Sequence, residues 1–278
     1  MGRTVCRHGP GPRLNLTQHR CDNNAPSLRY VRLAVVSTDA TFQRARRPEH
    51  KQQRQDAILD AARELAGGHG VRNVSLTDIA SQVGIHKSAL LRYFETREQI
   101  FLKLTAQAWL DWSRALHAAL DPAVPGAGDT GAGDTGAGDT GTAGTGPADV
   151  VADVMARSFA DRPLLCDLIP HTALNLERNV STEAVRRYKL TSLAVVADAA
   201  RLVQRVLPEL TVEECGEFVS TMAVLAGAWW QIANPPPALA DLYAADPQLA
   251  GACLDLASQL RRVATVLLAG LVPSRIRP

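Results

Sequence analysis

The apolar residues of this 278-residue chain recur every three or four positions wherever they form a sustained pattern, and no segment alternates with period two. The first spacing places apolar side chains on one face of an α-helix, whereas alternation is typical of a strand. The most regular stripe follows a 4-3-4-3-4 spacing through Leu249, Cys253, Leu256, Leu260, Val263 and Leu267. The sequence therefore predicts an all-α fold.

The composition limits the class of protein further. With 46% apolar residues the chain can bury a core, which argues against a fully disordered protein. No apolar run approaches the roughly 20 residues that span a bilayer, and no signal peptide is evident. The five cysteines are scattered and odd in number, so we expect free thiols and a reducing, cytoplasmic compartment with no membrane partner.

Charge divides the chain into two unequal parts. Residues 1–103 carry 17 basic and 9 acidic side chains, whereas residues 104–278 carry 13 and 19. A basic N-terminal part favours a polyanionic partner. Residues 1–47 are rich in Arg, Pro and Gly without any period, and we interpret them as a disordered basic arm. The arm either follows phosphates or is simply a solvated tail.

Several local signals set the expected helices. The first begins near His50 and stops at Gly67-Gly68 and Gly70, and a capping box at Ser75–Asp78 opens a short helix. Another short helix covers Lys87–Phe94, and a second capping box at Thr96–Gln99 opens a long helix to Leu116 or Leu120. Further helices are expected at 148–160, 163–178, 182–206, 211–233 and 248–271. We therefore assign 48–96 and 97–278 as two domains, the second interrupted by a flexible linker at 121–147.

Some motifs match enzyme signatures but lack the flanking secondary structure that such signatures require. The linker contains three copies of Gly-Ala-Gly-Asp-Thr, which match both GxGxxG and the Asp-Thr-Gly triplet, but no strand precedes them and no helix with an acidic partner follows. Cys6, His8, His19 and Cys21 lack the spacing of zinc ligands. We therefore predict no catalytic residues, no metal and no cofactor, and expect that the protein is not an enzyme.

Residues Ser75 to Phe94 form the segment that indicates function. A short helix, a turn at Gly84 and a second short helix make a helix-turn-helix, in which Ala80 is small where the helices cross. Ile79, Val83, Ile85 and Leu90 are expected to face inward. The start and outer face of the second helix, which enters the major groove in such motifs, then remain free to contact DNA. A helical hairpin with no role in DNA binding is the alternative.

Residues 52–104 closely resemble the N-terminal domain of the TetR family of bacterial repressors. The likeness runs through Gly70–Ala80, Val83-Gly-Ile, Ala89-Leu, Tyr93-Phe94 and Arg97-Glu, and the helical remainder has the length of that family's ligand-binding and dimerisation domain. Residues 162–178 also resemble a regulatory domain of one subgroup. The resemblance implies a helix-turn-helix domain at 48–96 and an effector-binding, dimerising domain at 97–278.

Carried over position by position, the resemblance implies a set of DNA contacts. Lys87 and Ser88 become candidates for contacts with base edges or nearby phosphates, and Thr77, Tyr93 and Arg97 for contacts with phosphates. The full set expected at the interface is Ser75, Thr77, His86, Lys87, Ser88, Leu91, Arg92, Tyr93 and Arg97. The family commonly has Tyr at the position of Leu91, so one phosphate-binding hydroxyl is missing.

The resemblance also implies a mechanism. We expect a homodimer that binds a double-stranded, pseudo-palindromic operator and is released when a small, largely apolar effector moves the fourth helix. Candidate effector contacts are aromatic or polar residues on core-facing helical stripes: Trp109, Trp112, Met155, Phe159, His171, Asn175 and Trp230. Each of them also suits plain core. Two alternatives remain: an activator or architectural DNA binder of the same fold, and a helical sensor or interaction module that has lost DNA binding.

Overall fold

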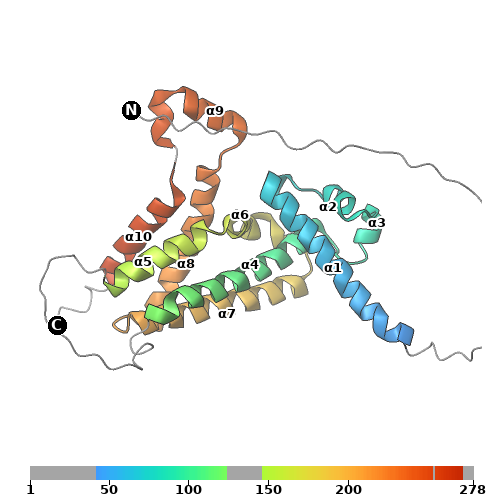
Figure 1. The fold of residues 1–278 in the computed structure, drawn as a ribbon, viewed down its shortest axis with the longest axis horizontal. Helices are drawn as coiled ribbons and strands as arrows, with labels where there is room; N and C mark the ends of the chain where they lie inside the picture. Colours follow the sequence, from blue (N-terminus) through green and yellow to red (C-terminus); the bar gives the residue numbers. More distant parts are fainter. Residues whose placement is uncertain (1–41, 124–145, 253, 272–278) are drawn as a thin grey trace, which may run out of the picture. The chain divides into compact units, whose positions relative to one another are not determined.

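A computed structural model describes residues 42–123, 146–252 and 254–271. Within these ranges the chain consists of helices and turns without any strand (Figure 1), so the predicted all-α fold is confirmed. Residues 45–94 are called the head. The head contains α1 (Phe42–His69) from Ala45 onward, the 3₁₀ turn η1 (Val71–Asn73), α2 (Leu76–Val83) and α3 (Lys87–Leu90).

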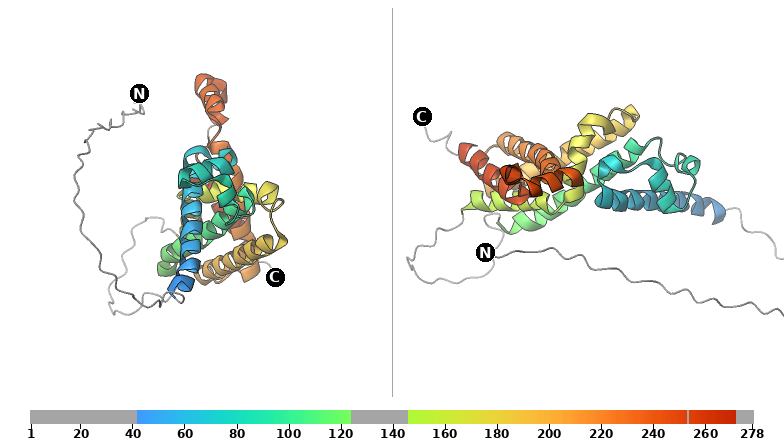
Figure 2. Two further views of the ribbon diagram at one scale, coloured as in Figure 1. Left: turned by 90° about the vertical axis from the view of Figure 1, so that its right-hand side faces the viewer. Right: turned by 90° about the horizontal axis from the view of Figure 1, so that it is seen from above.

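The remaining described residues, 97–271, are called the body. Its elements are α4 (Arg97–Leu120), η2 (Asp121–Ala123), α5 (Pro147–Ala160), α6 (Pro163–His171), the π-helical turn η3 (Thr172–Leu176), α7 (Thr182–Val206), α8 (Val212–Ala233), α9 (Pro237–Ala245), η4 (Pro247–Ala252) and α10 (Leu256–Leu271). α4 lies along α7, α6 packs on α8, and α5 packs on α10 (Figures 1 and 2). α4 thus leads directly from the head into the centre of the body.

Helices α6 and α8 approach each other closely at Gly227. A Cβ atom on this residue would lie 2.9 Å from Cγ2 of Ile169 and 2.9 Å from Cδ of Pro170. Real Cβ atoms do not come so near to other side chains, because overlap of this size exceeds what a packed interior tolerates. The two helices can therefore lie this close only because residue 227 has no side chain.

Two of the predicted body helices are wrong in their extent. The expected helix at 163–178 changes to a π-helical turn after His171, because Pro170 has no N–H to donate; the Glu177 N–H then bonds to the Thr172 carbonyl at 3.1 Å. The expected helix at 248–271 begins only at Leu256. The Asp255 carboxylate caps it there by accepting the Ser258 N–H at 2.9 Å.

Helix α9 was not predicted at all. It has no buried residue, so its sequence carries no stripe of apolar residues that face a core. Pro237 suits the first turn of a helix because that turn needs no N–H donor. The three consecutive prolines at 235–237 follow the end of α8 at Ala233.

The first helix begins earlier than predicted. It begins at Phe42, so residues 42–47 of the predicted disordered arm are helical, since this stretch contains good helix formers and no breaker. Of the three glycines predicted to stop it, the helix passes through Gly67 and Gly68 and ends before Gly70, where φ reaches +78°. Residues 1–41, with Cys6, His8, His19 and Cys21, and linker residues 124–145 lie outside the described residues.

Two of the predicted buried thiols are confirmed. Cys166 and Cys215 are free and buried, and burial raises their pKa values to about 12 and about 11. Thiols of this kind stay protonated and unreactive at neutral pH. Cys253 is not among the described residues. No helix in the described ranges is long and apolar enough to cross a membrane.

Candidate nucleic-acid interface

The helix-turn-helix is fixed by its predicted local signals. The Ser75 hydroxyl accepts the Asp78 N–H at 3.2 Å, and the Asp78 carboxylate accepts the Ser75 N–H at 2.8 Å, which completes the capping box of α2. These hydrogen bonds lower the pKa of Asp78. Gly84 ends α2 at φ +70°, where a Cβ would strain the backbone, and Ala80 is buried at the crossing. The turn is therefore built as predicted.

Helix α3 is shorter than expected. Its α-helical part covers only Lys87–Leu90, and the chain continues through Tyr93 in a tighter turn, in which the Tyr93 N–H bonds to the Leu90 carbonyl at 2.9 Å. This tightening lets Leu90 and Phe94 both enter the core of the head. At the start of α3, Nδ1 of His86 accepts the Ser88 N–H at 3.3 Å. His86 is thus the N-cap of the recognition helix.

The predicted contact residues divide into two groups. Seven are exposed on the head: Ser75, Thr77, His86, Lys87, Ser88, Leu91 and Arg92. Tyr93 is half-buried. Among the described residues, the side chains of Lys87 and Arg92 have no hydrogen-bond or ion-pair partner. The start of α3 therefore presents unpaired positive charge to solvent, which is what a phosphate backbone or a guanine edge attracts.

Arg97 does not belong to that exposed group. Its guanidinium turns inward and donates hydrogen bonds to the carbonyls of Val71 and Val74, and it lies 4.5 Å from the centroid of the Phe101 ring. The carbonyls belong to the segment that leads into α2. In this conformation Arg97 therefore ties the start of the helix-turn-helix to α4, and its guanidinium is not exposed with the other predicted contacts.

A second tie between head and body was missed by sequence reasoning. The carboxylate of Asp167 on α6 accepts the Val71 N–H at 2.7 Å and Nε2 of Gln231 at 2.9 Å, with His171 Nε2 at 3.6 Å. Burial raises the pKa of Asp167, but these hydrogen bonds outweigh it and leave the pKa below its usual value. The only indication of this contact in the sequence is that Asp167 lies one helical turn before His171 in a short, mostly apolar helix.

Four predicted effector contacts form a filled cluster in the body. Trp112 stacks on Phe159 with ring centroids 5.0 Å apart, Trp109 meets Trp112 edge-on at 5.4 Å, and Met155 is fully buried. Nε1 of Trp112 donates to Ser158 at 2.9 Å. The cluster satisfies the packing preferences of aromatic side chains. In this conformation these four residues are core, which was the alternative interpretation.

The other predicted effector contacts differ in their surroundings. His171 pairs with Asp167, Trp230 is half-buried on α8, and Asn175 lies in the turn η3. Oδ1 of Asn175 and Nε1 of Trp109 are buried without a hydrogen-bond partner in the described part of the chain. Buried polar atoms of this kind are uncommon, because each one costs about 1–3 kcal/mol. Of the seven predicted effector contacts, Trp109 and Asn175 are therefore the two with a buried polar atom that could form a hydrogen bond with a ligand.

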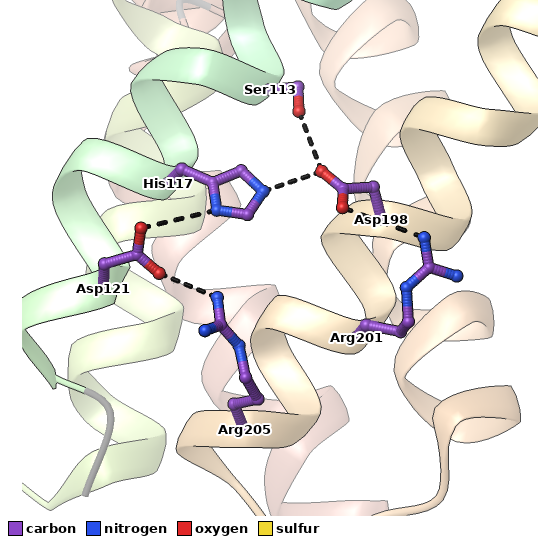
Figure 3. Close-up of polar contacts among 6 residues, drawn as sticks. All are labelled: Ser113, His117, Asp121, Asp198, Arg201 and Arg205. Atoms are coloured by element: carbon purple, nitrogen blue, oxygen red, sulfur yellow. Dashed lines mark hydrogen bonds and ion pairs between the residues drawn. The ribbon is translucent and has the colours of Figure 1, made fainter. Parts of the chain in front are cut away.

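Polar side chains join α4 to α7 at the far end of the body (Figure 3). His117 lies between two carboxylates, with Nε2 2.7 Å from Asp198 Oδ2 and Nδ1 3.5 Å from Asp121 Oδ2, and Arg205 reaches Asp121 at 2.7 Å. Ser113 donates to Asp198 and not to His117, so these side chains lack the serine–histidine hydrogen bond of a Ser–His–Asp triad. The arrangement is a structural network and not a catalytic triad. Its hydrogen bonds, above all that of His117, lower the pKa of Asp198.

Comparison with known proteins assigns the chain to a family. Residues 106–275 match the family profile described as "Tetracyclin repressor-like, C-terminal domain", which covers more than half of the chain. Residues 58–104 match "Bacterial regulatory proteins, tetR family". The chain belongs to the TetR family. It is a transcriptional regulator with a DNA-binding helix-turn-helix, and TetR-family regulators are generally not enzymes.

Individual relatives are distant. The HTH-type transcriptional regulator BetI of Agrobacterium fabrum is 34% identical over 67 residues, 24% of this chain and 32% of BetI, so the match spans about a third of that protein. A putative TetR-family regulator of Mesorhizobium loti is 13% identical, with 81% and 97% of the chains covered and a TM-score of 0.47. FadR of Thermus thermophilus, a TetR-family repressor solved in complex with lauroyl-CoA, is 15% identical, with 81% and 96% covered and a TM-score of 0.46.

Proposed function

We propose that this TetR-family protein is a ligand-released repressor that binds a pseudo-palindromic operator as a homodimer. The observation that carries the proposal is the unpaired positive charge of Lys87 and Arg92 at the exposed start of α3. An exposed, unpaired charge is hydrated in the free protein and carries no desolvation penalty. When it binds a DNA phosphate, the DNA releases condensed counterions, and this release favours the complex. In this proposal Lys87 and Ser88 contact base edges in the major groove, and Arg92 contacts the phosphate backbone.

The first turn of α2 supplies the second half of the interface. Because Ser75 and Asp78 satisfy only each other's N–H groups, the remaining N–H groups of that turn are free for an anion, and Thr77 is exposed beside them. Leu91 is 44% exposed where a polar residue is common in the family, and it suits contact with a thymine methyl group. Tyr93, which is half-buried in the head, is also proposed to contact a phosphate.

Dimerisation is proposed through α8 and α10. Val224 on α8 and Val266 on α10 are 65% and 64% exposed, and a hollow of about 280 Å³ between the two helices is lined by Phe218 and Leu267. Large apolar side chains gathered on one face favour a partner surface. Two copies of this face would form a four-helix interface and set two heads at the spacing of successive major grooves.

Release by an effector is proposed to act through the two ties between head and body. Arg97 on α4 and Asp167 on α6 hold the same short segment, at Val71 and Val74, from two different helices. A largely apolar effector that enters between α4 and α6, with its polar atoms on Trp109 and Asn175, would shift these helices and the segment with them. Release requires that the effector bind more tightly to the conformation that cannot bind DNA.

Fluorescence anisotropy tests the proposal with the duplex upstream of the protein's own gene, a scrambled duplex and two salt concentrations. We expect selective, salt-sensitive binding that Lys87→Ala with Arg92→Ala weakens at least about tenfold, with the salt slope reduced by about two. Arg178→Ala removes an exposed body charge as the matched control. No preference over the scrambled duplex, for neighbouring promoters as well, would favour a sensor that has lost DNA binding. A reporter gene separates a repressor from an activator.

A further inference from the structure

A cavity of about 330 Å³ lies where α1, the turn after α3, α4 and α7 meet. Its floor is apolar, because Phe94, Leu102, Ala184 and Tyr188 line it and are each at least nine-tenths buried. A volume of this size, with an apolar floor, is in the range that holds small organic ligands. The cavity is separate from the aromatic cluster in the body, since none of the seven predicted effector contacts lines it.

The rim of this cavity is positively charged. Lys103 and Arg187 both line it, and its lining residues include no carboxylate. Of the neutral polar side chains that line it, Gln55 donates to the Tyr93 carbonyl at 3.4 Å, the Gln99 side chain accepts the Glu95 N–H at 2.7 Å, and the Thr191 hydroxyl donates to the Arg187 carbonyl at 3.1 Å. The charged side chains of the lining are both cationic.

Both cations are available to a ligand. Among the described residues Lys103 has no anionic partner, and its ammonium lies 5.8 Å from the centroid of the Phe94 ring. Arg187 pairs with Glu183 at 3.5 Å, but the two side chains are 64% and 60% exposed. Solvated ion pairs of this kind are worth at most about 1 kcal/mol, so an anion inside the cavity can compete for Arg187.

A second cavity beside α4 makes the contrast clear. It is lined by Arg63 and Arg162, but also by Asp111. Arg63 bonds to Asp60 and Gln107, and Arg162 donates to the Ser158 carbonyl at 2.8 Å. The charges of this second cavity are therefore already used within the protein, whereas those of the first are not.

We propose that the cavity between α1, α4 and α7 binds a small organic anion with an apolar body. Its carboxylate or sulfonate lies between Lys103 and Arg187, where charge-assisted hydrogen bonds are strong. Its rings or alkyl chain lie on Phe94, Leu102 and Tyr188. Such a ligand touches the head and the body at once and stabilises their present arrangement. Binding at this site does not depend on the proposed repressor function.

Isothermal titration calorimetry without DNA tests the site with two probes of nearly the same shape, 2-naphthoate and the uncharged 2-naphthamide. We expect saturable binding of 2-naphthoate to the full chain, weakened at least tenfold by Lys103→Gln with Arg187→Gln. The amide should bind both proteins equally, within twofold. Arg186→Gln removes a neighbouring exposed charge of α7 that does not line the cavity, and it should leave 2-naphthoate binding unchanged within twofold.

Three outcomes would overturn the proposal: no saturable binding of 2-naphthoate, equal loss with Arg186→Gln, or unchanged binding to the double variant. Thr191→Trp provides an independent arm, because an indole at this rim position fills the cavity and should abolish binding of both probes. Circular dichroism confirms that each variant is folded. Since no assay contains DNA, failure here leaves the operator-binding proposal untouched, and failure of operator binding leaves this one untouched.

Discussion

The head and the body both have an apolar core, but they differ in how far they also rely on hydrogen bonds. In the head, the short helices α2 and α3 bury Ile79 and Leu90 and are in addition fixed by hydrogen bonds to the backbone, from the capping box at Ser75, the His86 cap and the guanidinium of Arg97. In the body, long helices are fixed mainly by apolar side chains that interlock, as at Trp112 and Phe159. Short helices bury little surface each, so polar contacts contribute a larger share of what holds them.

Two arginines near the junction of head and body show this difference. Arg92 and Arg97 are five residues apart, yet Arg92 is exposed without a partner in the described residues, whereas the guanidinium of Arg97 reaches from α4 to backbone carbonyls of the head. Four predictions test the difference, in order of decreasing effect.

Arg97→Met should have the largest effect on stability. It removes a charged donor from two carbonyls that remain partly buried, and we expect a loss of about 3 kcal/mol in the free energy of unfolding. Urea denaturation measures this. Arg92→Met is the matched control and should stay within about 0.5 kcal/mol. Equal stability of both variants would show that Arg97 is free for DNA after all.

Gly227→Ala tests the packing of the body. The added methyl group would meet Ile169 and Pro170 at 2.9 Å, and we expect a loss of about 1–3 kcal/mol from overpacking. Gly67→Ala, in a helical position of α1 with nothing within 4 Å, should instead gain about 0.5–1 kcal/mol. If both substitutions stabilise the protein in thermal melts, α6 and α8 do not pack this closely.

Asp167→Asn tests the tie between the two regions. The carboxyl pKa is lower in the folded protein than its usual 3.8, so the stability it contributes is present at neutral pH and is lost as pH falls below about 4. We expect the variant to be about 1–2 kcal/mol less stable than the wild type at pH 7, and this difference to narrow as the pH falls from about 4 through the lowered folded-state pKa, where the wild type loses the contribution of the carboxylate. Urea titrations across pH, with the exposed Asp241→Asn as control, measure the convergence.

His117→Ala should have the smallest effect. Its partners Asp121 and Asp198 are 49% and 41% exposed, so water screens the network and we expect a loss under about 1 kcal/mol. The loss should shrink further in high salt, as for other exposed ion pairs. A salt-independent loss of several kcal/mol would mean that this polar network, rather than apolar packing, holds α4 to α7.

The sequence by itself determined the class of fold, the helix-turn-helix and its caps. Those features depend on neighbours within four residues, such as Ser75 with Asp78 or Thr211 with Glu214, and local contacts are readable from spacing. Even there, the Thr96–Gln99 box formed only in part: Thr96 caps the Gln99 N–H, but the Gln99 side chain bonds to the Glu95 N–H instead.

Only the tertiary structure decided what each long side chain does. Arg97 reaches carbonyls 26 and 23 residues away, and Asp167 reaches a backbone N–H 96 residues away. The residues that line a pocket could not be predicted from the apolar stripes of the helices. Such a stripe indicates that a side chain faces the core, but not whether the side chains around it leave a cavity. Trp112 is packed in the core, whereas the cavity of about 330 Å³ lies beside Lys103 and Arg187, where three helices far apart in the sequence meet.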